Sequence, residues 1–242
     1  METDVHYPTD INLLFDAMRK TIEVCAHFCD EQGLTDWRQS AHNIRKLKKL
    51  YRRAQRIKHS TSKEEGKREA RREEIKAAHQ AYLEQAETSL RRARDTRMTL
   101  VIGCGVLPAL LADLDAYIAH AERQIDQIRR RVIFGETIPH EEKVFSIFEP
   151  HTEWISKGKA GVPVELGLRV CVLEDQHRFI LHHRVMEKIT DDKVAVEMVE
   201  ETRKRFPQLV SVSMDKGFHS PANQVDLQER LDQVYLPKKG KI

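Results

Sequence analysis

Apolar side chains recur every three or four residues through most of the first 134 residues, a spacing that places them along one side of an α-helix. There are four such stripes, and the first ends near Gly33. The fourth ends at the basic run Arg129–Arg131, where cations suit the negative end of the helix dipole. The pattern predicts long helices that pack antiparallel. The stripes are Leu14, Met18, Ile22, Cys25 and Phe28; Ile44, Leu47, Tyr51 and Ala54; Ile75, Tyr82, Ala86, Leu90 and Ala93; and Leu107, Leu111, Leu114, Ile118, Ala121, Ile125, Ile128 and Val132.

The composition changes at about Phe134–Gly135, and short strand patterns then alternate with helical ones. Two strands, a helix capped near Thr190, a strand, a helix opened by Ser220 and Pro221 and a final strand follow in that order. This order is typical of an α/β layer, so the chain as a whole is expected to be α+β. The expected strands are 164–173, 179–185, 209–214 and 234–236.

Composition excludes several classes of protein. Charged residues make up 33% of the chain, and no apolar stretch approaches the roughly 18 residues that span a bilayer. The N-terminus lacks the basic lead and apolar run of a secretory signal. Four cysteines in 242 residues do not form a disulfide scaffold. We therefore expect a cytoplasmic protein with no membrane segment.

Positive charge is concentrated in one block, although the net charge is only +3. Nine basic residues and no acidic residue lie between Arg38 and Lys58. The block is either a solvated helix face or a contact for the phosphate backbone of a nucleic acid. Lys48, Lys49 and Arg52 are the candidate phosphate contacts, with Lys157, Lys159, Lys238 and Lys239 as a second basic surface. Glu64, Glu65, Glu73 and Glu74 on the next helix could instead neutralise the block.

Residues that could hold a metal are few. Cys25, His27 and Cys29 lie on one helix, where His27 points away from both thiols, so core cysteines are the better interpretation than a zinc site. Asp215 follows a strand and precedes a glycine turn. An aspartate there is either a turn former or part of a ligand site, because ligands bind beyond the carboxyl ends of strands in open α/β sheets.

Several segments spread along the chain resemble the DDE-type insertion-sequence transposases of the ISNCY group. The segments are ETDVHYPTD (2–10), KVFSIFEPHTEWI (143–155), KGK (157–159), PVELG (163–167), DKGFHS (215–220) and LPKKGK (236–241). The resemblance implies a ribonuclease-H-like core that holds two Mg²⁺ ions through an Asp, Asp, Glu triad, with Asp215 as the second aspartate, a catalytic residue and metal ligand. The implied partner is double-stranded DNA at transposon ends, and a homodimer is allowed.

The resemblance also implies where the chain departs from a complete enzyme. The first aspartate of the triad is expected upstream of Met1, and the glutamate is expected beyond Ile242. The expected organisation is the start of the catalytic core and the first helix (1–35), a long antiparallel helical insertion (36–134) and an incomplete ribonuclease-H-like core (135–242). The predicted function is that of a transposase fragment without activity of its own. The alternative is a helical nucleic-acid-binding or scaffold protein with no catalytic ancestry.

Overall fold

The chain forms two compact units, one helical and one of mixed helices and strands. The computed structural model describes residues 9–156, 164–238 and 240. The helical unit spans Val5–Pro150, and the second unit includes His151–Ile242. The protein is mostly helical with small two-stranded sheets, so the expected α+β class is confirmed. No helix in the described ranges has both the length and the apolar character of a bilayer-spanning segment.

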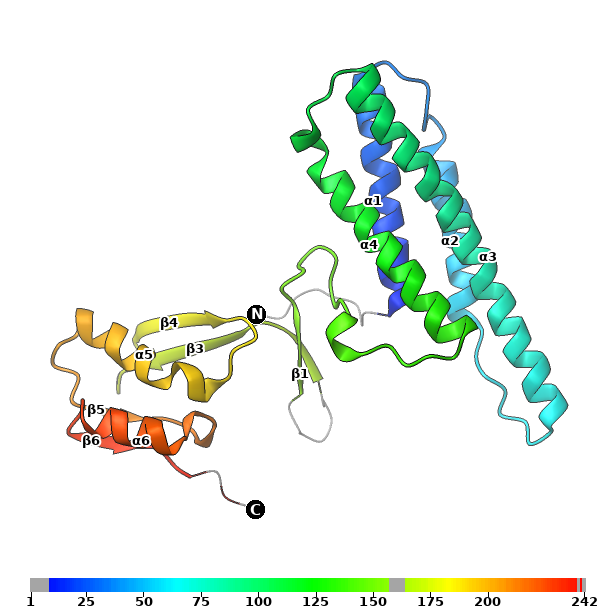
Figure 1. Cartoon of the computed structure of the whole chain (residues 1–242). Helices are drawn as coiled ribbons and strands as arrows, with labels where there is room; N and C mark the ends of the chain where they lie inside the picture. Colours follow the sequence, from blue (N-terminus) through cyan, green and yellow to red (C-terminus); the bar gives the residue numbers. More distant parts are fainter. Residues whose placement is uncertain (1–8, 157–163, 239, 241–242) are drawn as a thin grey trace. The chain divides into compact units, whose positions relative to one another are not determined.

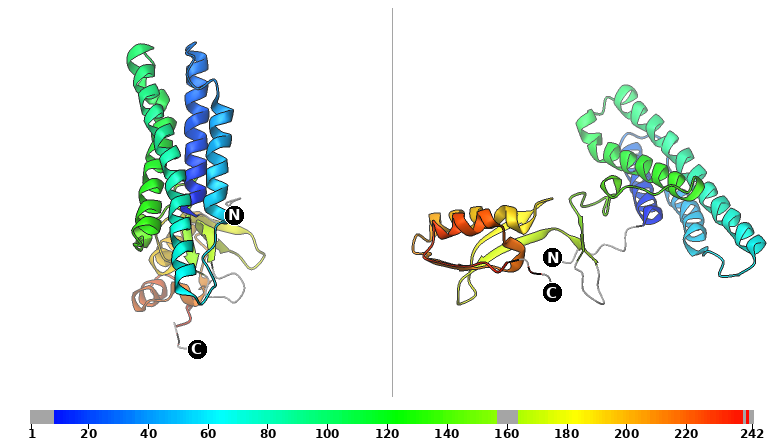
Figure 2. Two further views of the ribbon diagram at one scale, coloured as in Figure 1. Left: turned by 90° about the vertical axis from the view of Figure 1, so that its right-hand side faces the viewer. Right: turned by 60° about the horizontal axis from the view of Figure 1, so that its bottom comes forward.

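Four long helices make up the helical unit and lie side by side (Figures 1 and 2). They are α1 (Asp10–Glu31), α2 (Ser40–Arg56), α3 (Glu65–Met98) and α4 (Ala112–Ile128). The predicted apolar stripes supply most of their shared core, in which Leu14, Ile22 and Leu114 are fully buried. Local periodicity therefore predicted which side of each helix packs inward.

The predicted stripe is wrong at Leu107, which is 66% exposed. The chain leaves α3 through a π-helical turn, η1 (Thr99–Gly103), and re-enters helix through a 3₁₀ turn, η2 (Pro108–Leu111). Because α4 begins only at Ala112, Leu107 precedes the helix that its spacing appeared to join. Two further turns, η3 (Arg129–Ile133) and η4 (His140–Glu142), follow α4.

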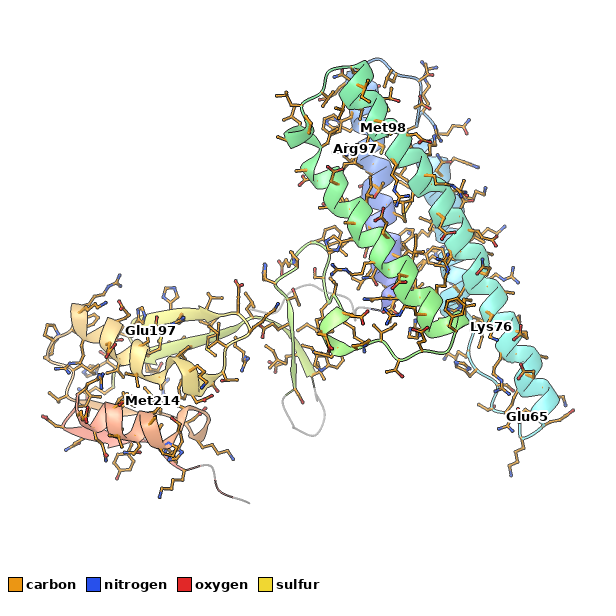
Figure 3. The ribbon with its side chains drawn as sticks, in the orientation of Figure 1. Glu65, Lys76, Arg97, Met98, Glu197 and Met214 are labelled. Carbon is orange, nitrogen blue, oxygen red and sulfur yellow. The ribbon has the colours of Figure 1, made fainter. Side chains whose placement is uncertain are left out.

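Helix α3 is much longer than its neighbours, and its first turns carry almost no buried side chains. Glu65 and Met98 mark its two ends in Figure 3. The first buried residue of α3 is Ile75. Ion pairs between side chains of the helix itself support the exposed turns, including Arg71–Glu74 at 2.6 Å and Arg72–Glu69 at 2.8 Å. Exposed pairs of this kind contribute about 0.3–0.5 kcal/mol each.

His79 is a buried titratable group in α3. Its Nδ1 lies 2.8 Å from the Ile75 carbonyl oxygen. Burial lowers the pKa of His79 below its ordinary value of 6.5; the hydrogen bond to Ile75 opposes this shift and the Arg131 charge adds to it. The unfolded chain therefore binds this proton more tightly than the folded chain, and stability falls as the pH drops below about 6.5.

We expect the melting temperature of the helical unit to be lower at pH 5 than at pH 7.5, measured by circular dichroism at equal ionic strength. His79→Gln should reduce this pH dependence. His120, whose pKa burial also lowers, should account for part of what is left. His42→Gln is the control because His42 is exposed. Equal pH dependence in the His79 and His42 variants would contradict the argument.

The second unit contains three separate two-stranded sheets. They are the antiparallel pair β1 (Glu153–Ser156) and β2 (Val164–Gly167), the antiparallel pair β3 (Arg169–Glu174) and β4 (Ile180–Met186), and the parallel pair β5 (Ser211–Ser213) and β6 (Gln233–Tyr235). Helices α5 (Asp191–Arg205) and α6 (Pro221–Gln228) lie on one face of β3 to β6 (Figure 2). Met186, Val199 and Leu227 are buried in this unit's core.

Two expectations for this unit are wrong. The strand expected over 164–173 is divided into β2 and β3 at Gly167, whose φ of 146° a residue with a Cβ rarely adopts. Strand β1 was not predicted, because it lies outside all four expected strands. The described strands also do not join into the single sheet that the resemblance implies. The Ser220 cap is confirmed, since the Ser220 hydroxyl accepts from the Asn223 amide at 3.1 Å. A turn closed by the Arg178 amide, which donates to the Asp175 carbonyl oxygen at 3.0 Å, joins β3 to β4.

Candidate functional site

The acid-free block forms an exposed basic face on and beside α2, which we call the basic ridge. Its members are Arg38, Arg45, Lys46, Lys48, Lys49, Arg52, Arg53, Arg56 and Lys58, and all nine are exposed. The opposite side of α2 buries Leu47 and Ala54 in the helical unit. Six of the ridge residues, including Lys48, Lys49 and Arg52, line a surface hollow that no acidic residue enters.

Aromatic contacts hold α2 against α1 below the ridge. The rings of Phe15 and Tyr51 stack with their centroids 4.9 Å apart, and the Lys48 ammonium lies 5.9 Å from the Phe15 ring centroid. The Tyr51 hydroxyl donates to the Asn12 side chain at 3.1 Å and accepts from the Gln55 amide at 2.8 Å. These contacts fix the rotation of α2, so the cations stay outward.

The acidic residues that could have neutralised the ridge are paired elsewhere. Glu64, Glu65, Glu73 and Glu74 form ion pairs with Lys67, Arg68, Arg72, Lys76 and Arg71, all on or beside α3. Within the described part of the chain, no ion pair joins an acidic side chain to the basic ridge. The ridge is therefore a concentration of positive charge without an internal counter-charge, which favours an external anion.

The second basic surface is only partly described. Lys238 is exposed after β6, in the second unit. Lys157, Lys159 and Lys239 lie outside the described residues. The structure therefore brings Lys48, Lys49 and Arg52 together on one helix, whereas Lys238 belongs to a different unit.

Asp215 lies at the carboxyl end of β5, as expected, and caps the 3₁₀ turn η5 (Lys216–Phe218). Its Oδ1 accepts a hydrogen bond from the Gly217 amide at 2.6 Å. The buried Asn223 holds this turn against α5, because its side-chain amide donates to the carbonyl oxygens of Asp192 at 2.7 Å and Phe218 at 2.8 Å. The turn-former interpretation of Asp215 is thus satisfied by the geometry.

A second carboxylate lies beside Asp215. A Cβ built on Gly217 would lie 2.7 Å from Asp191 Oδ2 and 2.8 Å from Asp215 Oδ1, so both side chains close on the same glycine. Both carboxylates also add to the effect of burial in raising the pKa of the Cys171 thiol. Asp191 was not predicted as a site residue, because an aspartate next to Thr190 at the start of a helix is typical of a cap. Asp191 and Asp215 are 24 residues apart in the sequence, so no local pattern connects them. Only the packing of η5 on α5 brings them together.

Replacing Gly217 with alanine is expected to destabilise the second unit by about 1 kcal/mol, because the new methyl group displaces two carboxylate oxygens, one of which accepts a hydrogen bond from the Gly217 amide. Chemical denaturation followed by circular dichroism measures the effect. Gly66→Ala is the control: nothing lies within 4 Å of its added Cβ, and Gly66 is the second residue of α3. Because Gly66 is at the end of its helix, the control should gain less than the roughly 0.5–1 kcal/mol expected in the middle of a helix. Equal stability of Gly217→Ala and the natural chain would contradict the close approach.

The residues around Asp215 do not fit a two-magnesium centre. Among the described residues, no group of three or more His, Cys, Asp or Glu side chains could hold a metal ion. Two carboxylates provide too few oxygen ligands for two hard cations. The Cys25 and Cys29 side chains are buried in the helical core and His27 is exposed, in agreement with core cysteines rather than a zinc site.

Comparison with known proteins gives no relative for this chain. No family model matches it, and neither a curated protein nor a solved structure is significantly similar to it. The site geometry and the sequence resemblance are therefore the two indications of its function.

Proposed function

We propose that this chain binds the phosphate backbone of double-stranded DNA through the basic ridge, as part of a DDE-type transposase with an incomplete ribonuclease-H-like core. The observation that carries the proposal is the absence, within the described residues, of acidic partners for nine exposed cations. The expected cofactor is Mg²⁺, and this chain alone would not hold it as a two-ion centre.

The ridge has the dimensions of a backbone contact. Its helical part, on α2 (Ser40–Arg56, 17 residues), extends for about 25 Å at 1.5 Å per helical residue. Duplex DNA offers one negative charge per about 1.7 Å of axis, so a row of cations this long meets many phosphates. Phosphate contacts position a protein on DNA without reading its sequence. Binding through the ridge would therefore be strong at low salt and indifferent to base sequence.

Asp215 supports the transposase part of the proposal. It lies at the carboxyl end of a strand that pairs in parallel with β6, where catalytic carboxylates of open α/β sheets are expected. The face of the β3–β4 hairpin that carries Val170, Val172 and Val185 is about half exposed. This half-exposed apolar face supports the proposal of an incomplete core, in which further helices or strands would cover these valines.

The chain is expected to leave supercoiled plasmid DNA intact in the presence of Mg²⁺ or Mn²⁺. The reason is ligand count, since Asp191 and Asp215 are too few to hold two metal ions. Gel electrophoresis of the plasmid measures nicking and linearisation. Cleavage by the natural chain that is lost in Asp215→Asn would overturn the expected inactivity.

The second candidate is a helical nucleic-acid-binding protein without catalytic ancestry. It is favoured by one observation: the helical unit has its own core and carries the whole basic ridge. The DNA on either side of the segment that encodes residues 1–242 distinguishes the two candidates. Under the transposase proposal it encodes an upstream strand with an aspartate and a downstream helix with a glutamate, and under the alternative it encodes neither.

A further inference from the structure

A pocket with a volume of about 470 Å³, which we call the η3 pocket, lies in the helical unit where α2 ends and η3 follows α4. Residues of α1, α2, α3 and η3 line it, and all of its described lining belongs to the helical unit. Lys76, labelled in Figure 3, lines it from α3. Small-molecule sites typically have volumes of about 300–1,000 Å³, so the space suits a ligand of that kind.

The floor of the η3 pocket is apolar. Ile11, Ala54 and Ile75 are buried there, each from a different helix. Phe134 also lines the pocket, and its side chain is 64% exposed. An exposed aromatic ring beside an apolar floor offers a packing surface to a flat apolar occupant.

The charged lining residues of the η3 pocket are all basic. They are Arg72, Lys76 and Arg131, and neither aspartate nor glutamate is among the described lining residues. Arg72 and Lys76 each pair with a glutamate of their own helix. These pairs are exposed, and exposed pairs hold their partners weakly. The pocket therefore presents positive charge to an occupant.

Arg131 keeps part of its guanidinium free. Its Nε donates to Asp10 at 2.7 Å, and within the described residues its two terminal amino groups make no hydrogen bond. A guanidinium has five N–H donors, so the terminal edge of Arg131 can donate two parallel hydrogen bonds to a carboxylate.

A buried histidine adds a polar group to the floor. His79 lines the η3 pocket and is 5% exposed. Because Nδ1 lies 2.8 Å from the Ile75 carbonyl oxygen, Nδ1 carries the ring proton and Nε2 of the neutral ring is an acceptor. No residue in the described ranges donates to Nε2. An apolar lining with a few convergent polar groups is typical of a small-molecule site.

We propose that the η3 pocket binds a small aromatic carboxylate. The ring packs between Phe134 and the apolar floor, and the carboxylate accepts from the terminal edge of Arg131. A rigid ring loses little conformational freedom on binding, which favours it over a flexible chain. No member of the basic ridge is among the described lining residues, so the site is separate from the proposed DNA contact.

Nuclear magnetic resonance of the histidine side chains in the full chain, titrated with 2-naphthoate, tests the proposal. The His79 ring signals should shift and reach saturation with a Kd below about 1 mM, which a ligand of this size attains. The signals of His42, an exposed residue of α2, should stay unchanged. 2-Naphthamide has the same ring without the charge and should bind at least tenfold more weakly.

Two pairs of variants locate the site. Phe134→Ala should weaken binding at least fivefold, whereas Phe179→Ala, which removes a ring of similar exposure from the second unit, should have no effect. Arg131→Gln should weaken binding at least tenfold. Arg123→Gln is its control, since Arg123 is exposed on α4 and does not line the pocket. All four side chains are exposed, so circular dichroism should show four folded variants.

Three results would each overturn the proposal. The first is a His79 signal that does not shift with 2-naphthoate, because the pocket then stays empty. The second is equal binding of 2-naphthamide, which would exclude recognition of the carboxylate. The third is unchanged binding in both Phe134→Ala and Arg131→Gln, since the ligand would then occupy another apolar surface.

Discussion

Alanine at Lys48, Lys49 and Arg52 together is expected to flatten the plot of log K against log salt for duplex DNA by about two to three units. Each of the three cations is exposed on the same side of α2 and has no acidic partner among the described residues. Each phosphate contact adds about 0.9 to the slope, so the natural chain should lose about 40-fold more affinity than the variant between 50 and 200 mM salt. Fluorescence anisotropy with a labelled duplex measures both slopes.

A second triple variant supplies the control for this prediction. Arg68, Arg72 and Lys76 are exposed or nearly so, and they pair with glutamates of their own helix. Their replacement with alanine removes the same net charge but should leave the slope almost unchanged. If the ridge variant keeps the natural slope, the DNA surface lies elsewhere, and Lys238 with Lys157, Lys159 and Lys239 becomes the next surface to test.

Trp37→Ala is expected to lower the free energy of unfolding of the helical unit by about 3–5 kcal/mol. The Trp37 side chain is only 2% exposed, and its indole nitrogen donates to the Thr96 hydroxyl at 2.8 Å. The Arg92 guanidinium lies 4.3 Å from the ring centroid. The substitution removes a large buried ring and a link between sequence positions 59 residues apart. A loss of this size is a large part of the 5–15 kcal/mol that stabilises a typical domain.

Trp37→Phe distinguishes the contribution of the buried ring from that of the indole N–H group. It keeps an aromatic ring in the core and removes the donor to Thr96, so we expect a loss nearer 1 kcal/mol for the hydrogen bond together with a smaller packing loss. Urea denaturation of the two variants, followed by circular dichroism at 222 nm, gives both values. Similar stabilities for the alanine variant and the natural chain would show that Trp37 is not a core anchor.

The start of α2 illustrates what the sequence could not predict. Thr35 and Asp36 are residue types that favour the N-cap position, but α2 begins at Ser40 with Gln39 as a cap that makes no side-chain hydrogen bond. Trp37 has a positive φ of 64°, which stops the chain from entering a right-handed helix there. Its burial against residues from distant helices outweighs the local capping preference. Periodicity predicts the inward face of a helix, whereas its first residue depends on tertiary packing.

The candidate sites likewise include features that could be predicted from the sequence and features that could not. The basic ridge could be predicted because its charge and its helical face are local properties of a continuous segment. The pairing of Glu73 and Glu74 within α3 could not, because spacing allows both an intrahelical and an interhelical partner. The approach of Asp191 to Asp215 depends on Asn223, whose side chain connects two segments that the sequence keeps apart. The transposase activity and its DNA partner stay predictions from the resemblance.

The continuity of the helical unit has a consequence for how the chain is made. The unit ends at Pro150, and its helices contact partners that precede that residue. Domains generally fold as units during synthesis, N-terminal first, and helical bundles fold quickly because most of their contacts are local. The four helices can therefore assemble while the ribosome is still adding β3 to β6. The basic ridge would then be displayed on a nascent chain, close to ribosomal RNA, before the strands that flank Asp215 have been translated.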